Sequence, residues 1–104
     1  MTLMMLSEQF RLAAKDYVDA DNAASLLEEM KSATLSQLML ENSDLPVSRA
    51  EMMVKGSDGW KDYIRSMVGA RTKANELKFK LEWLRMRFSE QQSAQATARA
   101  EMKL

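Results

Sequence analysis

Few side chains in this sequence are suited to catalysis or to metal binding. The chain has no Cys and no His, which excludes thiolate chemistry and removes the commonest general base and the commonest metal ligand. Glu28 and Glu29 are adjacent, so on a helix their carboxylates point in different directions. The segment Lys55-Gly56-Ser57 lacks the upstream glycine and the preceding strand of a phosphate-binding loop. The sequence therefore predicts a protein that is not an enzyme and that needs no cofactor or metal.

Basic and aromatic side chains are interleaved between residues 78 and 88, and this pattern suits two different roles. Lys and Arg hold phosphates while aromatic rings stack on bases, so one role is nucleic-acid binding. The candidate nucleic-acid residues are Lys73, Lys78, Lys80, Arg85 and Arg87. In the other role these bases flank a packed helical seam and are neutralised by an acidic helix. The sequence pI of about 6.3 favours the second role, because nucleic-acid-binding domains are usually more basic.

A second apolar line lies on the opposite side of the same predicted helix. Phe79, Trp83 and Met86 are spaced by four and then three residues, so they share one face. The candidate protein-interface residues are Val68, Phe79, Trp83 and Met86. Because contiguous exposed apolar patches mark interfaces, we expect this face to bind a second copy of the chain. Two alternatives are that residues 52–54 of a short helix fold over the face, or that an unknown protein partner covers it.

The elements that position these residues are two long helices. Between residues 60 and 88, apolar side chains recur at alternating steps of three and four, which is the pattern of one seam on a long helix. The seam residues are Trp60, Tyr63, Met67, Ala70, Ala74, Leu77, Leu81, Leu84 and Phe88. Every position that flanks this seam from residue 71 to residue 87 is basic, so two copies side by side would repel each other. The seam therefore favours an acidic partner helix.

The N-terminal part of the chain supplies an acidic helix of this kind. Its seam residues are Leu6, Phe10, Ala13, Tyr17, Ala20, Ala24 and Leu27. Asp16, Asp21 and Glu28 flank this seam, and in an antiparallel pair they meet the basic flanks of the C-terminal helix. Such exposed charges set orientation more than they stabilise. The sequence predicts an all-α, coiled-coil-like antiparallel hairpin that assembles into a helical bundle, with the helices paired within one chain or swapped between two.

Turn and capping signals divide this single domain, residues 1–104, into segments. We expect a helix over about 3–41, a loop over 42–48, a short helix over 49–55 and a long helix over about 58–100. Ser48 and Glu51 have the spacing of a capping box at the start of the short helix. Ser57 or Asp58 is the expected N-cap of the last helix. Beyond residue 88 the seam decays into Gln, Ala and Ser, so we expect this end to fray or to be ordered only by a second subunit.

Charge is unevenly distributed along the chain although the net charge is zero. Residues 1–60 hold ten acids against five bases, a net charge of −5, and residues 61–104 hold ten bases against five acids, a net charge of +5. This division indicates either pairing between the halves or a basic surface that serves a partner. The N-terminal apolar run is too short for a signal peptide, and no run approaches the roughly 20 residues of a membrane span. We expect a cytoplasmic protein with no membrane partner.

Several segments of the C-terminal half carry a family resemblance. They are Leu45-Pro46-Val47-Ser48, Trp60-Lys61-Asp62-Tyr63, Met67-Val68-Gly69-Ala70-Arg71-Thr72-Lys73-Ala74-Asn75 and Leu84-Arg85-Met86-Arg87-Phe88-Ser89. Over roughly the last 60 residues, the chain resembles a group of small helical proteins encoded by bacteriophages and prophages. The resemblance implies a phage context in the host cytoplasm, where small helical proteins commonly serve recombination, replication or interference with host systems. It implies no catalytic residues.

Together these observations predict a small accessory protein that acts by binding another macromolecule. The first hypothesis is a protein-interaction module that modulates host or phage DNA machinery. The second is a nucleic-acid-binding protein of recombination or replication that uses the basic face of the C-terminal helix. The third is a structural or assembly component of a virion.

Overall fold

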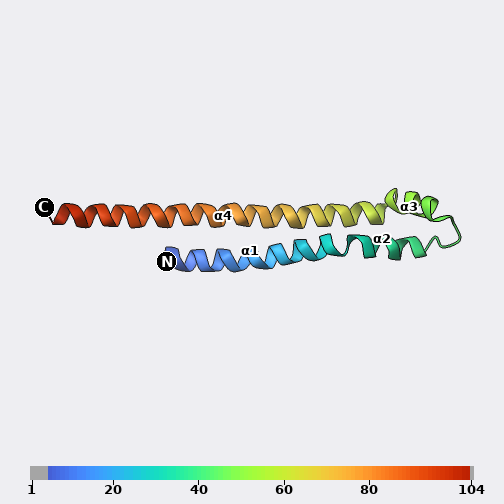
Figure 1. The fold of residues 1–104 in the computed structure, drawn as a ribbon, viewed down its shortest axis with the longest axis horizontal. Coiled ribbons are helices and arrows are strands. Elements are labelled where there is room, and N and C mark those ends of the chain that lie inside the picture. Colours follow the sequence, from blue (N-terminus) through green and yellow to red (C-terminus); the bar gives the residue numbers. More distant parts are fainter. Residues whose placement is uncertain (1–4, 104) are drawn as a thin grey trace.

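The chain forms a long antiparallel hairpin of helices, as predicted. The computed structural model describes residues 5–103. Its helices are α1 (Leu6–Glu29), α2 (Lys31–Leu40), α3 (Val47–Lys55) and α4 (Asp58–Met102). The first two run along one side, α3 forms the elbow, and α4 returns beside them and extends past the start of α1 (Figure 1). The all-α hairpin is therefore confirmed, and the described part of the chain contains no strand.

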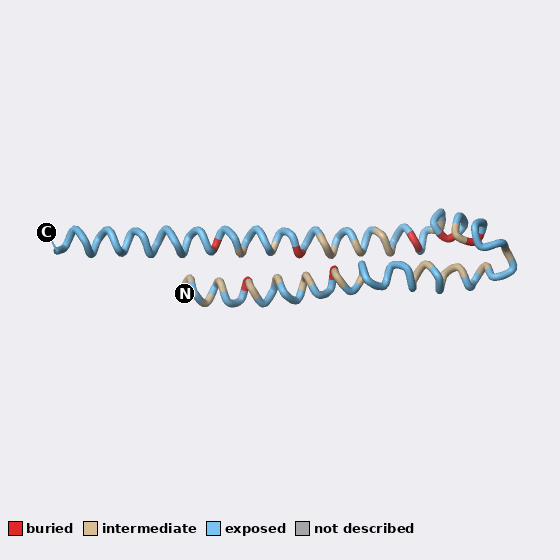
Figure 2. Tube along the Cα trace, in the orientation of Figure 1, coloured by how far each residue is buried: buried red, intermediate tan, exposed pale blue. Residues whose placement is uncertain are grey.

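Two facing seams of apolar side chains hold α1 against α4, and they are the seams that the sequence predicts. Ala13 and Ala24 are buried on α1, and Ala74 and Leu84 are buried on α4. Figure 2 shows the buried positions at intervals along the facing sides of the two helices. Ala24 and Ala74 are each 0% exposed, because a methyl group leaves no side chain to hold the two backbones apart. Between α1 and α4, the core is thus a narrow line of contacts.

The first predicted helix is interrupted at Met30. We expected one helix over residues 3–41, of which residues 3 and 4 lie outside the described part, and the structure divides the remainder into α1 and α2. Beside the interruption, the Tyr63 hydroxyl of α4 donates a hydrogen bond to the Leu27 carbonyl. In a continuous helix that carbonyl accepts from the N–H four residues later, so Tyr63 competes for it. The Tyr63 ring is itself fixed by stacking on Trp60, with the ring centroids 5.7 Å apart.

The elbow differs from the prediction in where its helix begins. α3 starts directly after Pro46, two residues earlier than predicted, and the preceding loop covers residues 41–46. The predicted capping box of Ser48 and Glu51 is wrong, because Ser48 already lies in the first turn and no side chain caps α3. Pro46 takes the N-cap position with φ −57°, the value that its ring imposes, and the helix follows at once. Glu51 pairs instead with Lys55, with Oε1 and Nζ 2.8 Å apart.

The beginning of α4 follows the prediction. The Ser57 hydroxyl oxygen accepts a hydrogen bond from the Trp60 N–H at 3.3 Å and donates one to the Val54 carbonyl, so Ser57 is the N-cap. The helix ends at Met102, close to the predicted residue 100. All side chains from residue 89 to residue 103 are exposed, which agrees with the decay of the seam in the sequence. The effect of a second subunit on this end stays a prediction.

The hairpin is far more extended than a globular chain of its size. Its principal dimensions are 84 × 27 × 17 Å, and its radius of gyration is 23.2 Å. A compact domain of this length has a radius of gyration of about 13 Å. The accessible surface is 8282 Å², whereas a folded monomer of this mass exposes about 5,900 Å². An unusually large share of the side chains is therefore available for contacts with other molecules.

Candidate functional site

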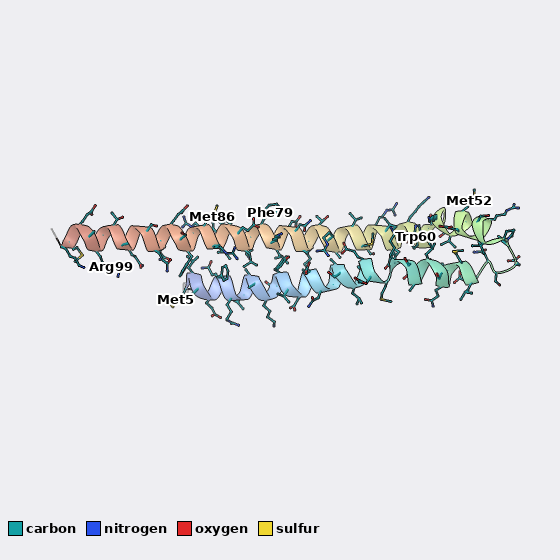
Figure 3. All side chains as sticks on the ribbon, viewed as in Figure 1. Met5, Met52, Trp60, Phe79, Met86 and Arg99 are labelled. Carbon is teal, nitrogen blue, oxygen red and sulfur yellow. The ribbon has the colours of Figure 1, made fainter. Side chains whose placement is uncertain are left out.

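The predicted interface residues form an exposed apolar line on α4. Val68 and Trp83 are each 54% exposed, Met86 is 59% exposed and Phe79 is 71% exposed. Figure 3 shows Phe79 and Met86 on the side of α4 that faces away from α1. We call these four residues the outer stripe. None of the residues 5–103 covers the outer stripe, so the described hairpin carries a hydrophobic surface that is open to a partner.

The elbow helix does not cover the outer stripe, so that alternative is wrong. α3 packs against α2 and the first part of α4 (Figure 1). It buries Ala50 and Val54 there, while Met52 and Met53 remain exposed. α3 ends three residues before α4 begins, so it stays at the elbow end of the hairpin. Phe79 lies about 30 Å further along α4, given a rise of about 1.5 Å per residue.

Arg71 closes one side of the seam between α1 and α4. Its guanidinium pairs with Asp21, at 2.6 Å from Nη1 to Oδ1, and with Glu28, at 2.7 Å from Nη2 to Oε1. It also donates hydrogen bonds from Nε to Glu28 at 3.0 Å and from Nη2 to the Ser25 hydroxyl at 3.2 Å. These are the partners that the antiparallel arrangement predicts for Arg71. The planar guanidinium fork makes this contact a specific clamp on the register of the two helices.

Replacing Arg71 with Gln should remove a pH-dependent part of the stability. The hydrogen bond from Arg71 lowers the pKa of Glu28 below its usual value, and the same contact raises the pKa of Arg71. Because the folded pKa of Glu28 is lowered, its stabilisation is complete above the unfolded value of about 4.3 and is lost as pH falls through the folded value. Urea denaturation of both proteins at about pH 7 and about pH 3 checks this.

The wild-type midpoint should fall further between the two pH values than that of the Arg71→Gln variant. The matched control is Arg65→Gln, because among the described residues Arg65 pairs with Asp62 of its own helix alone, at 3.3 Å. Both of those side chains are largely exposed, so this variant should show the wild-type pH dependence. An equal fall in wild type and Arg71→Gln would contradict the role of the clamp.

The other basic flanks are not neutralised by α1 in this way. Lys73, Lys78 and Lys80 make no ion pair with any of the residues 5–103. The Arg85 guanidinium lies over the Phe10 ring at 5.9 Å from its centroid, which is a cation–π contact across the seam. Arg87 lies over the Trp83 ring at 5.7 Å and is 3.9 Å from the Glu90 carboxylate. The predicted pairing of basic flanks with acidic α1 is therefore confirmed only at Arg71.

On the side of the seam opposite Arg71, the hairpin has an open groove with a volume of about 500 Å³. Its lining residues are Asp16, Asp19, Ala20, Ala23, Ala70, Lys73 and Leu77. Within the described part of the chain, neither aspartate forms an ion pair. Sequence reasoning missed this groove, although the small seam residues Ala20 and Ala70, with Ala23 beside the seam, could have indicated that no large side chain fills it.

Neither a carboxylate cluster for a metal ion nor a membrane-spanning helix occurs among the described residues. Residues 5–103 contain no group of three or more carboxylates placed to hold a metal ion. None of the described helices has both the length and the apolar character needed to cross a membrane. Comparison of the chain with known protein families, with curated proteins and with solved structures finds no match.

Proposed function

We propose that this protein is a non-enzymatic, phage-type accessory protein that acts by binding a partner protein through the outer stripe. The single observation that carries the proposal is the uncovered line of large apolar side chains on α4. Trp83 is central to that line, and the Arg87 guanidinium packs on its ring. Trp and Arg are the residue types that most often dominate the energy of an interface. A modulator of host or phage DNA machinery fits this kind of surface.

The shape and charge of the outer stripe favour an amphipathic helix as the element that docks on it. The stripe is narrow and straight, because its residues follow the three-and-four spacing of one helix face. Glu76 and Glu90 lie seven residues before and after Trp83, so they lie on the same line and flank its central apolar residues, Phe79, Trp83 and Met86. A partner helix with two or three central apolar residues and basic residues beyond them would match this surface.

Replacing Trp83 with Ala should weaken partner binding about 30-fold or more, as expected for a hot-spot residue worth about 2 kcal/mol. The partner can first be captured in cells with a photoreactive phenylalanine analogue at Phe79, which is exposed and adjacent to Trp83. The yield of the crosslinked product, and then calorimetry on the purified pair, measure the effect. The Trp83→Ala variant should lose most of the product.

The matched control is Val18→Ala, because Val18 is 52% exposed but lies on α1. This variant should retain the product. A second control places the photoreactive group at Thr97, on α4 beyond the stripe. If no specific product forms at Phe79, or if Thr97 gives the same product, the outer stripe is not the binding surface.

A second candidate function is nucleic-acid binding, and the unpaired lysines favour it. Lys73, Lys78 and Lys80 have no acidic partner among the described residues, so their ammonium groups are available to phosphates. Light scattering with a short DNA duplex and a single strand, at low and at high salt, tests this function. A mass increase that disappears at high salt supports it, and an unchanged mass at low salt excludes it.

A further inference from the structure

The extended shape of one hairpin leaves a large surface exposed. Its accessible surface exceeds that of a folded monomer of equal mass by about 2,300 Å². Each partner in a standard protein interface contributes about 800 Å². The excess is therefore large enough for a stable interface and for a further binding surface. The position of the second copy can be inferred from the charges on the two sides of the seam.

We propose that a second copy of this chain binds over the open groove, so that α1 of each copy lies on α4 of the other. The groove carries Asp16 and Asp19 on its α1 wall and Lys73 on its α4 wall. Lys80 lies seven residues after Lys73 and so points to the same side of α4. All four charges lack an ion-pair partner among the described residues. Each hairpin thus presents one acidic row beside one basic row.

The charges select one orientation of the two copies. If the two-fold axis runs parallel to the helices, the acidic row of each copy lies on the basic row of the other. If the axis runs across the helices, α1 meets α1 and the aspartates face each other. In the first arrangement, each residue of one copy stays at the same height along the bundle as its equivalent in the other copy. Within one hairpin Arg85 lies beside Phe10, so in this antiparallel register Asp16 and Lys80 lie at similar heights. The result is a four-helix bundle with both elbows at the same end.

Apolar side chains complete the proposed interface. Ala20, Ala23 and Ala70 form the floor of the groove, so a second helix can approach closely. Leu12 and Leu26 lie seven residues on either side of Asp19 and thus on the same side of α1. Both leucines are exposed in the hairpin, and Leu26 is 60% exposed. In the dimer, these leucines lie against α4 of the second copy.

The outer stripe is a poorer place for the second copy than the sequence alone suggests. In a parallel pairing of two stripes, Glu76 and Glu90 would each face their own counterpart, because they lie on the same line as Trp83. In an antiparallel pairing centred near residue 81, Lys80 would face Lys80 and Glu82 would face Glu82. Like charges meet in both cases. Pairing over the groove brings opposite charges together instead, and it leaves the outer stripe exposed to a different partner.

Light scattering on two charge-reversed double variants tests the proposed face. The first variant is Asp16→Lys with Asp19→Lys, and the second is Lys73→Glu with Lys80→Glu. The wild type should be a dimer, and each variant alone should dissociate with a dissociation constant about tenfold higher or more, since several pairs become repulsive. Mixing the two variants should restore the dimer, because every reversed row then meets its opposite. Circular dichroism confirms that each variant stays helical.

The matched control reverses Lys61 and Lys103 to Glu, because both are exposed on α4 or directly after it and lie outside the groove. This variant should remain a dimer. A monomeric wild type would overturn the proposal. So would a dimer that the two groove variants leave intact, or a mixture of the variants that does not associate.

The orientation is tested with a spin label at Ser43, in the elbow loop. The chain has no native cysteine, so Ser43→Cys gives one label per copy. With both elbows at one end, the labels should lie within about 30 Å, because neighbouring helices pack about 8–10 Å apart. Elbows at opposite ends would place the labels about 60 Å apart. A distance in the second range would overturn the proposed orientation.

Binding at the outer stripe and dimerisation over the groove can be tested independently of each other. Trp83→Ala should weaken binding of the partner protein about 30-fold or more while the mass of the dimer stays unchanged. The charge-reversed groove variants should change the mass of the dimer without removing the side chains of the outer stripe. Loss of dimer mass in Trp83→Ala would instead place the second copy on the outer stripe and would overturn the assignment to the groove.

Discussion

Replacing Leu84 with Ala should lower the free energy of unfolding by about 2–5 kcal/mol. Leu84 is 2% exposed and is the largest side chain in the described residues that is completely enclosed. It lies at the end of the α4 seam where the first turns of α1 pack. Truncation removes the transfer energy of the missing carbons and leaves a cavity that two rigid helices cannot easily close. Urea denaturation followed by circular dichroism measures the change.

The control for this experiment is Met86→Ala, two residues further along α4. Met86 is 59% exposed and lies on the outer stripe, so its removal should change stability by no more than about 0.5 kcal/mol. The comparison separates burial against α1 from any general effect of alanine on the helix. Equal losses for the two variants would show that Leu84 does not face α1 in solution.

Replacing Ala74 with Leu should also destabilise the hairpin, by about 1–3 kcal/mol. Ala74 and Ala24 are each 0% exposed, so each methyl group is fully enclosed in the seam between the two helices. A leucine would force the backbones apart and would strain the adjacent Arg71 clamp on Asp21 and Glu28. The same denaturation experiment measures the change.

Ala94→Leu provides the matched control, because Ala94 is an exposed residue of the same helix. Leucine and alanine are both good helix formers, so this change should have little effect. Unchanged stability in Ala74→Leu would mean that α1 and α4 are separated at Ala74, and the register described above would then be wrong.

Periodicity made most of the hairpin predictable. The three-and-four spacing identifies both seams, and Ala13, Ala24, Ala74 and Leu84 are buried on them as expected. The opposite charges of the flanks predicted the antiparallel orientation and the pairing of Arg71 with α1. The positions of the seam residues and of the flanking charges on each helix follow from the helical repeat, which is a local property of the sequence.

The features that sequence reasoning missed depend on contacts between distant residues. The interruption at Met30 coincides with a hydrogen bond from Tyr63, which is 36 residues away from its partner Leu27. Likewise, Lys73 makes no ion pair with the described residues of α1, and it lies beside the open groove that Ala20 and Ala23 line. A pattern of charges predicts which rows face each other, but the width of the space between them is set by the packing of both helices.

The exposed position of Phe79, Trp83 and Met86 was predicted correctly, because it follows from the same helical repeat. What covers this line was not predictable in the same way. The alternative in which α3 folds over it failed on geometry, since α3 packs at the elbow end of the hairpin. The choice of a second copy for the groove and a different partner for the outer stripe comes from the charges beside each surface.

Because α4 is one uninterrupted helix, it fixes both the distance and the angle about the helix axis between the elbow and the outer stripe. Val47 and Met52 are exposed at the elbow, and Trp83 of the outer stripe lies about 35 Å along α4 from Trp60, at about 1.5 Å per residue. Inserting one residue between these regions would turn the outer stripe by about 100° relative to the elbow. A partner that contacts both would lose one contact, whereas a partner of the stripe alone would keep its site. α4 therefore sets the angle between the two exposed regions as well as the distance between them.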